Sequence, residues 1–279
     1  MMNSLQRVGF ILMAILAANS SFANTFSHTP WATILQQHVE MVRDGRESRV
    51  DYAGIKKDRL LLLTYLTDMS KVTKKSFDSW PKMQQLAFLI NAYNAWTVEL
   101  ILSRYPDIDS IKDLGSFFTS PWKKEFVNLL GEVRSLDDIE HNLIRGSGRY
   151  NEPRIHFAVN CASIGCPALL NDAYAGDKLD EQLAAVTENF LRDRNRHYFA
   201  NGELHISPIF KWYKADFEQG WNGVHSVSQF LAAYADALGL QDSGSGIIVN
   251  GKLVSERLSE DSIGISYTDY NWDLNDVAR

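Results

Sequence analysis

Apolar residues recur with helical spacing along most of the chain. This spacing predicts helices in five segments, over residues 31–43, 58–69, 81–104, 178–192 and 227–238. The third is the longest, because Pro81 suits a first helical turn and Pro106 ends the pattern. Helices therefore dominate the predicted structure.

Strand signals are few and scattered. Residues 154–160 are rich in β-branched and aromatic side chains and apolar on nearly both faces, which is typical of a central strand. Asn201-Gly202 and Asn250-Gly251 each predict a hairpin turn between short apolar runs. No repeat, low-complexity tract or long linker divides the chain. The sequence predicts a single domain over residues 24–279, of the α+β class, mostly helical with a small, mainly antiparallel sheet.

The first 23 residues follow the pattern of a secretory signal. Arg7 supplies the positive start, residues 8–18 form an apolar core too short to span a bilayer, and small residues stand at positions 21 and 23. We expect a signal peptide over residues 1–23 and a mature chain that is periplasmic or secreted. The alternative is an uncleaved N-terminal anchor.

Composition narrows the expected partners. Lys and Arg number 28 against 34 Asp and Glu, which gives a formal net charge of −6 and argues against a nucleic-acid-binding protein. No basic amphipathic helix favours a membrane partner after signal cleavage, and no glycine-rich phosphate loop appears between a strand and a helix. We expect a small-molecule or peptide substrate, with no cofactor and no metal.

Both cysteines, Cys161 and Cys166, lie within residues 154–167. An exported location and an even count favour a disulfide between them, and closing so small a loop stabilises the fold by about 2 kcal/mol. The competing hypothesis makes Cys161 a thiolate nucleophile, which needs a base, a cation or a helix N-terminus nearby. Cys166, between Gly165 and Pro167, is expected where a loop enters a helix, near its cap.

Two histidines are candidate bases for this thiol. His156 lies five residues before Cys161, but alternation along the predicted strand turns it to the opposite face from its neighbours. A capping box over residues 135–138 predicts one more helix, which opens at Ser135. His141 lies within this helix beside Glu140, whose carboxylate borders an apolar face and would orient an imidazole. The alternative for His141 and Glu140 is a solvated pair at the flank of the helix.

Polar residues also fall on one side of the long predicted helix, at Gln84, Asn91 and Asn94. This helix is otherwise apolar nearly all round, so the amides are expected to be buried and hydrogen-bonded. Structurally they would tie the helix to a neighbouring loop. Functionally, Asn91 would orient the base, and Asn94, Ser163 and Cys166 would contribute to binding, with backbone amides of residues 163–165 facing an oxyanion.

Three other interpretations are weaker. His141, His156, Cys161 and Cys166 offer zinc ligand types but not the usual short paired spacings. The aromatic run over residues 210–221 would suit a sugar platform, although its helical spacing favours a core role. A redox pair is also weaker, because the cysteines are not in the two-residue spacing of known oxidoreductases.

Several motifs, in register along the chain, resemble domain-of-unknown-function family 547. They are Ile90–Ala95, Ser110–Asp113, Ser135–His141, Arg154–Pro167, Phe210–Tyr213 and Asp216-Phe217. The resemblance covers roughly residues 31–235 and implies a single compact domain, often exported in bacteria, without a settled activity. It also implies that the second cysteine is lost more readily than the first, so a disulfide would not be the whole purpose of the site.

We therefore expect an exported cysteine-dependent hydrolase or acyl transferase that acts on a peptide or amide. Cys161 would be the nucleophile, one of the two histidines its base, and Glu140 or Asn91 the group that orients the base. The alternative is a non-catalytic domain that binds a ligand or partner and is stapled by a Cys161–Cys166 disulfide. The state of the two sulfurs and their distance from an imidazole separate these hypotheses.

Overall fold

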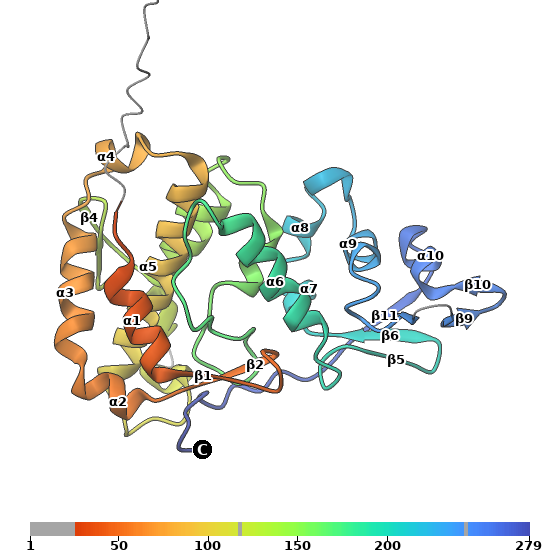
Figure 1. Cartoon of the computed structure of the whole chain (residues 1–279), viewed down its shortest axis with the longest axis horizontal. Helices are drawn as coiled ribbons and strands as arrows, with labels where there is room; N and C mark the ends of the chain where they lie inside the picture. Colours follow the sequence, from red (N-terminus) through yellow and green to blue (C-terminus); the bar gives the residue numbers. More distant parts are fainter. Residues whose placement is uncertain (1–25, 117–118, 243–244) are drawn as a thin grey trace, which may run out of the picture.

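A computed structural model describes residues 26–116, 119–242 and 245–279 of the chain (Figure 1). The predicted signal peptide over residues 1–23 lies outside the described residues. Helices dominate and the strands form only small sheets, mostly antiparallel, which confirms the α+β class. In the part of the chain that the structure describes, no helix is both long and apolar enough to cross a membrane.

The first half of the fold is built around α5 (Lys82–Leu102), which is buried along nearly its whole length because it is apolar on almost every side. Figure 1 shows α5 between α3 (Arg59–Ser70) on one side and α6 (Leu179–Leu191) on the other. These three helices confirm the predicted segments. The smaller elements of this half are α2 (Tyr52–Lys57), α4 (Lys74–Asp78), η1 (Ile111–Leu114), η2 (Pro121–Lys123), β3 (Val127–Leu129) and β4 (Glu132–Arg134).

The first predicted helix is too long. The helix α1 (Thr29–His38) ends early, and β1 (Val39–Val42) pairs antiparallel with β2 (Glu47–Val50). The turn between the strands has positive φ at residues 43–45, with values of 52°, 56° and 82°. The apolar spacing of this segment fits both a helix and a short strand, so periodicity alone misplaced the boundary.

The segment predicted as a central strand is instead a 3₁₀-helix, η4 (Pro153–Phe157). Its proline suits a first helical turn, and the Glu152 side chain caps it by accepting a hydrogen bond from the Arg154 amide at 3.2 Å. All residues from 153 to 160 are buried. The expected burial was correct but the conformation was wrong, because a continuous apolar run fits a buried helix as well as a buried strand.

The second half of the fold packs around a phenylalanine-rich cluster that includes Phe157, Phe190, Phe210, Phe217 and Phe230. Its helices are α7 (Ile209–Trp212), α8 (Lys214–Phe217), η5 (Trp221–Gly223), α9 (Val227–Ala233) and α10 (Val254–Ser259). The aromatic run over 210–221 therefore serves largely as core, as its spacing favoured. The helix α9 is shorter than its predicted segment.

Two hairpins follow the predicted turn signals. The paired strands are β5 (Tyr198–Ala200) with β6 (Glu203–Ile206), and β9 (Ile248–Val249) with β10 (Lys252–Leu253). The first hairpin becomes a three-stranded sheet when β11 (Gly264–Tyr267) pairs parallel to β6. A further short antiparallel pair joins β7 (Gln241–Asp242) and β8 (Ser245–Gly246).

After β11 the chain returns across the molecule towards β1 and β2 (Figure 1). The Val50 amide donates to the Asn275 carbonyl at 2.8 Å, and an isolated antiparallel bridge joins Ser163 to Leu274. This return places the C-terminal segment against the loop that carries both cysteines.

Candidate functional site

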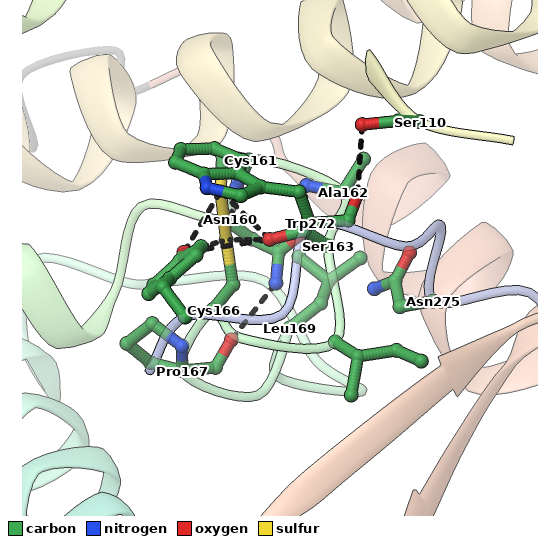
Figure 2. Close-up of a disulfide and its surroundings, with 12 residues drawn as sticks. Ser110, Asn160, Cys161, Ala162, Ser163, Cys166, Pro167, Leu169, Trp272 and Asn275 are labelled. Carbon is green, nitrogen blue, oxygen red and sulfur yellow. Dashed lines mark hydrogen bonds between the residues drawn. A yellow bond between two sulfur atoms is a disulfide. The ribbon is translucent and has the colours of Figure 1, made fainter. Parts of the chain in front are cut away.

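The cysteine loop is closed by a disulfide. The sulfurs of Cys161 and Cys166 are 2.18 Å apart, so neither thiol is free (Figure 2). The Asn160 side chain reinforces the loop by donating to the Pro167 carbonyl at 2.8 Å. Cys166 is not at a helix cap, contrary to expectation, because residues 158–178 contain no helix.

Hydroxyl groups surround the two sulfurs. The Tyr270 oxygen lies 3.2 Å from each sulfur, and the Ser163 oxygen lies 3.3 Å from that of Cys161. Burial raises the pKa of Tyr270 to about 12, so its hydroxyl remains protonated at neutral pH. Within the described residues, neither sulfur is hydrogen-bonded to an imidazole nitrogen.

Next to the disulfide is a cavity of about 230 Å³, bounded mainly by aromatic side chains. The six aromatic residues that line it are Tyr93, Trp122, Trp212, Tyr213, Tyr270 and Trp272. Trp212 is 47% exposed and lies at the solvent edge, while Tyr270 and Trp272 pack with their ring centroids 4.5 Å apart. The volume equals that of about eight water molecules in the liquid, which suits a small ligand.

Five of the eight predicted site residues line this cavity. They are Glu140, His141, His156, Cys161 and Cys166. The first two belong to η3 (Asp138–Arg145), a π-helix in which the Gly146 amide donates to the His141 carbonyl at 2.7 Å. The Ser135 hydroxyl accepts from the Asp138 amide at 3.0 Å, as the predicted cap requires. Single π-helical turns are rare and frequently occur at functional sites.

His156 is fully buried and bonded to a carboxylate that is not among the predicted site residues. Its Nε2 atom lies 2.7 Å from Asp216 Oδ2, and because a carboxylate only accepts, Nε2 carries the proton and Nδ1 has a lone pair. Burial lowers the pKa of His156, although the hydrogen bond to Asp216 opposes this shift. The ring is therefore neutral at pH 7, and it stacks on Tyr213 with centroids 3.8 Å apart.

Asp216 is compensated by Arg145, whose guanidinium donates to both of its oxygens. Burial alone would raise the pKa of Asp216, but the hydrogen bonds from His156 and Arg145 outweigh it and lower the pKa to about 2. Arg145 also donates to His141 Nδ1, which leaves His141 Nε2 3.7 Å from an Asp137 oxygen. The charge of Asp216 is thus neutralised within the protein.

Glu140 is in a different situation. It is only 4% exposed, and its Oε1 atom has no hydrogen-bond partner among the described residues; the same holds for His156 Nδ1. These two acceptor atoms lie 4.0 Å apart, too far for a direct hydrogen bond. Burial raises the pKa of Tyr213, and the negative charge of the nearby Glu140 carboxylate adds to the shift. Two buried acceptors therefore lie side by side at the cavity without a donor.

Asn91 and Asn94 lie outside the cavity. The Asn91 amide group donates to the Tyr174 carbonyl at 2.8 Å and accepts from the Tyr174 amide at 3.0 Å. Asn94 donates to the Ala158 carbonyl at 2.9 Å and accepts from the Asn160 amide at 2.8 Å. Both side chains tie α5 to loops, as in the structural alternative, and neither contacts an imidazole.

The backbone amides expected to face an oxyanion are already bonded. The Ile164 amide donates to the Asp273 carbonyl at 2.9 Å, and the Gly165 amide donates to the Asn271 carbonyl at 2.7 Å. The Ser163 side chain is buried against the sulfurs and does not line the cavity. The loop therefore does not present the pair of free donors that the oxyanion expectation required.

The cavity beside the disulfide is not the largest space in the molecule. A cavity of about 510 Å³ lies near the start of α1, between residues 26–29 and 172–178, and a shallower space of about 560 Å³ lies over α2 and α3. Neither is lined by a predicted site residue, so we do not assign the site there. Among the described residues, no group of three or more His, Cys, Asp and Glu side chains is arranged to hold a metal ion.

Several residues of the site were not selected from the sequence. Asp216 and Tyr213 belong to the motifs that resemble the family, and these motifs are the signal in the sequence that could have identified them. Tyr270 and Trp272 carry no local pattern, and they reach the cavity only because the C-terminal segment folds back.

Residues 77–191 match the model of a family described as a protein of unknown function, DUF547. Residues 77–191 therefore form a domain of this family, a shorter stretch than the roughly 31–235 over which the motifs resemble it. No curated protein and no solved structure matches the chain. The matched region contains Glu140, His156 and both cysteines, whereas four cavity-lining aromatic residues lie beyond it, at Trp212, Tyr213, Tyr270 and Trp272.

Proposed function

We propose that this protein is an exported small-molecule-binding domain, and that its site is the aromatic cavity beside the Cys161–Cys166 disulfide. The construction of the cavity is the observation that carries this proposal. A loop, the π-helix η3, α7 and the C-terminal segment line a pocket of about 230 Å³ that opens to solvent at Trp212. An aromatic-walled space with a few converging polar groups is the usual form of a ligand site.

The surroundings of the sulfurs favour binding over thiol chemistry. Both sulfurs are bonded to each other, and the amides of Ile164 and Gly165 are occupied by the C-terminal segment. The disulfide then serves to hold the loop that forms one wall of the cavity. The export proposal rests on the N-terminal signal pattern together with this disulfide.

The test is an NMR screen of the oxidised protein against neutral, anionic and cationic fragments. We expect bound fragments to shift the indole N–H resonances of Trp122, Trp212 and Trp272 together. Ile209→Trp should abolish the shifts because it fills the cavity, and the exposed Ile248→Trp is the matched control. Trp212→Ala is a second variant, since loss of an exposed ring leaves folding intact. Absence of any bound fragment, or binding unaffected by both variants, would contradict the proposal.

A second candidate function is the cysteine-dependent hydrolase or acyl transferase. It is favoured by one observation, that Cys161 shares the cavity with His156, His141 and Glu140. This activity requires reduction of the disulfide, so that a Cys161 thiol exists and reaches an imidazole. Alkylation of the unreduced periplasmic protein followed by intact mass measurement separates the two. Rapid labelling near neutral pH favours the enzyme, whereas labelling only after reduction favours the binding domain.

A further inference from the structure

We propose that the ligand of this cavity carries a primary or secondary ammonium group that donates to both Glu140 and His156. This inference rests on the proposed binding function and adds the chemical class of the ligand. It starts from the two acceptor atoms that lack a donor, Glu140 Oε1 and His156 Nδ1.

The geometry of these two atoms fits one shared donor group. They are 4.0 Å apart, so a nitrogen placed between them lies at about 2.8 Å from each, the length of a charge-assisted hydrogen bond. Both atoms are shielded from solvent, so the side chains around them must move aside to admit the ligand nitrogen. The donor cannot come from His156 itself, because its proton is on Nε2, bonded to Asp216. A group with two or more N–H bonds satisfies both acceptors at once.

The charge of the lining favours a cation. Asp137 and Glu140 contribute two carboxylates, and no lysine or arginine lines the cavity among the residues that the structure describes. The guanidinium of Arg145 does not line the cavity and donates hydrogen bonds to Asp216 and His141. An anionic ligand would meet the negative charges of Asp137 and Glu140 in a partly desolvated space, where such repulsion is strong.

The aromatic walls favour a cation as well. The face of an indole or phenol ring attracts an ammonium group within about 6 Å of its centroid. One of the lining rings already makes such a contact. The Lys112 ammonium lies 3.7 Å from the centroid of the Trp272 ring, although Lys112 itself does not line the cavity. A water molecule offers two donors to Glu140 and His156, but neither the rings nor the carboxylates prefer water to an ammonium.

A matched series of four probes tests the inference by titration of the indole resonances. The probes are benzylammonium, benzyl alcohol, benzoate and benzyltrimethylammonium, which share one ring and differ in charge or in N–H donors. We expect benzylammonium to bind at least about tenfold more tightly than the alcohol, because hydrogen bonds to charged groups are the stronger ones. Benzyltrimethylammonium should bind more weakly than benzylammonium, and benzoate should not bind.

Variants test whether the preference for benzylammonium depends on the acidic side of the cavity. Glu140→Gln should weaken benzylammonium binding by at least about tenfold, which is the contribution of one charged hydrogen bond, and leave the alcohol nearly unchanged. Asp137→Asn should give a smaller loss of the same kind, and it also serves if Glu140→Gln does not fold. Glu181→Gln, on the exposed face of α6, removes the same charge elsewhere and should have no effect.

The outcomes separate this inference from the proposed function. If benzyl alcohol or benzoate binds as tightly as benzylammonium, or if Glu140→Gln and Asp137→Asn both leave the affinity unchanged, the ammonium inference is wrong and cavity binding stands. If none of the four probes binds but the fragment screen yields neutral or anionic ligands, the ammonium inference is also wrong and cavity binding stands. If neither experiment yields a ligand, both proposals fail.

Discussion

Two pairs of buried polar side chains differ in one respect. Asn91 and Asn94, on α5, use their amides as donor and acceptor to backbone groups of neighbouring loops. Glu140 and His156, at the cavity, each keep one buried acceptor without a partner. The first pair is complete within the protein, whereas the second requires a donor from elsewhere.

This difference helps to distinguish buried polar side chains that support the fold from those that bind a ligand. A buried polar group without a partner costs free energy, so groups that only support the fold are normally satisfied internally. The asparagines meet that condition, and their predicted roles in catalysis or binding have no geometric support. The Glu140 and His156 pair does not meet it. Other buried atoms, such as the indole nitrogen of Trp31, also lack a partner among the described residues, so the pair is distinguished by lining the aromatic cavity as well.

The largest expected effect breaks the satisfied pair. Asn94→Leu leaves the Ala158 carbonyl and the Asn160 amide without partners in the core. We expect the free energy of unfolding to fall by about 2–5 kcal/mol, measured by urea denaturation, because two buried backbone groups lose their hydrogen bonds. A loss below about 1 kcal/mol would show that water replaces the side chain and would remove the contrast with Glu140.

The next effect concerns the disulfide wall of the cavity. The double variant Cys161→Ser, Cys166→Ser should lower the free energy of unfolding by about 2 kcal/mol, since the bridge closes a short loop in the unfolded chain. Reduction of the wild-type protein should cause the same loss and serves as the control. An unreduced wild-type protein that is no more stable than the variant contradicts the structural role of the bridge.

A pH dependence follows from the burial of His156. Burial lowers the pKa of His156 below its ordinary value of 6.5. The unfolded chain therefore takes up a proton on His156 as the pH falls through about 6.5, while the folded protein resists it, so stability is lost on acidification. One such proton contributes up to about 1.4 kcal/mol per pH unit.

The variant His156→Gln isolates this contribution. It should make the dependence of unfolding free energy on pH shallower between about pH 7 and pH 5, measured by urea denaturation at several pH values. His28 and His197, whose pKa values are also lowered by burial, remain in both proteins and do not affect the difference. An unchanged slope would indicate that the imidazole is protonated in the folded state.

The smallest expected effect is on the stability of Glu140→Gln. Because Glu140 Oε1 makes no hydrogen bond within the described structure, we expect the free energy of unfolding to change by less than about 1 kcal/mol. Urea denaturation of Glu140→Gln and Asn94→Leu under the same conditions measures the two free energies of unfolding. A loss as large as that of Asn94→Leu would place Glu140 among the structural groups.

Local patterns in the sequence were sufficient to predict those helices and turns that are determined by their own residues. The apolar surface of α5 and the turn residues Asn201-Gly202 predicted their structures, and the cysteine loop marked one wall of the cavity. The helix η4 was mistaken for a strand because its residues are buried all round, so periodicity carried no information on conformation.

The partners across the site could not be predicted, since they depend on how distant segments meet. Asp216 is 60 residues from His156 in the chain, and Tyr270 is 109 residues from Cys161. Which atoms of Glu140 and His156 remain without partners is a property of the assembled fold. The sequence therefore indicated where the site lies but not which of its groups are unsatisfied.

The account is tested most directly by a crystal structure of the oxidised protein with benzylammonium. We predict that the ligand nitrogen lies within about 3 Å of both Glu140 Oε1 and His156 Nδ1, with its ring among the tryptophans of the cavity. An ammonium bound elsewhere, or a cavity that holds only water with Glu140 and His156 hydrogen-bonded directly to each other, would contradict it.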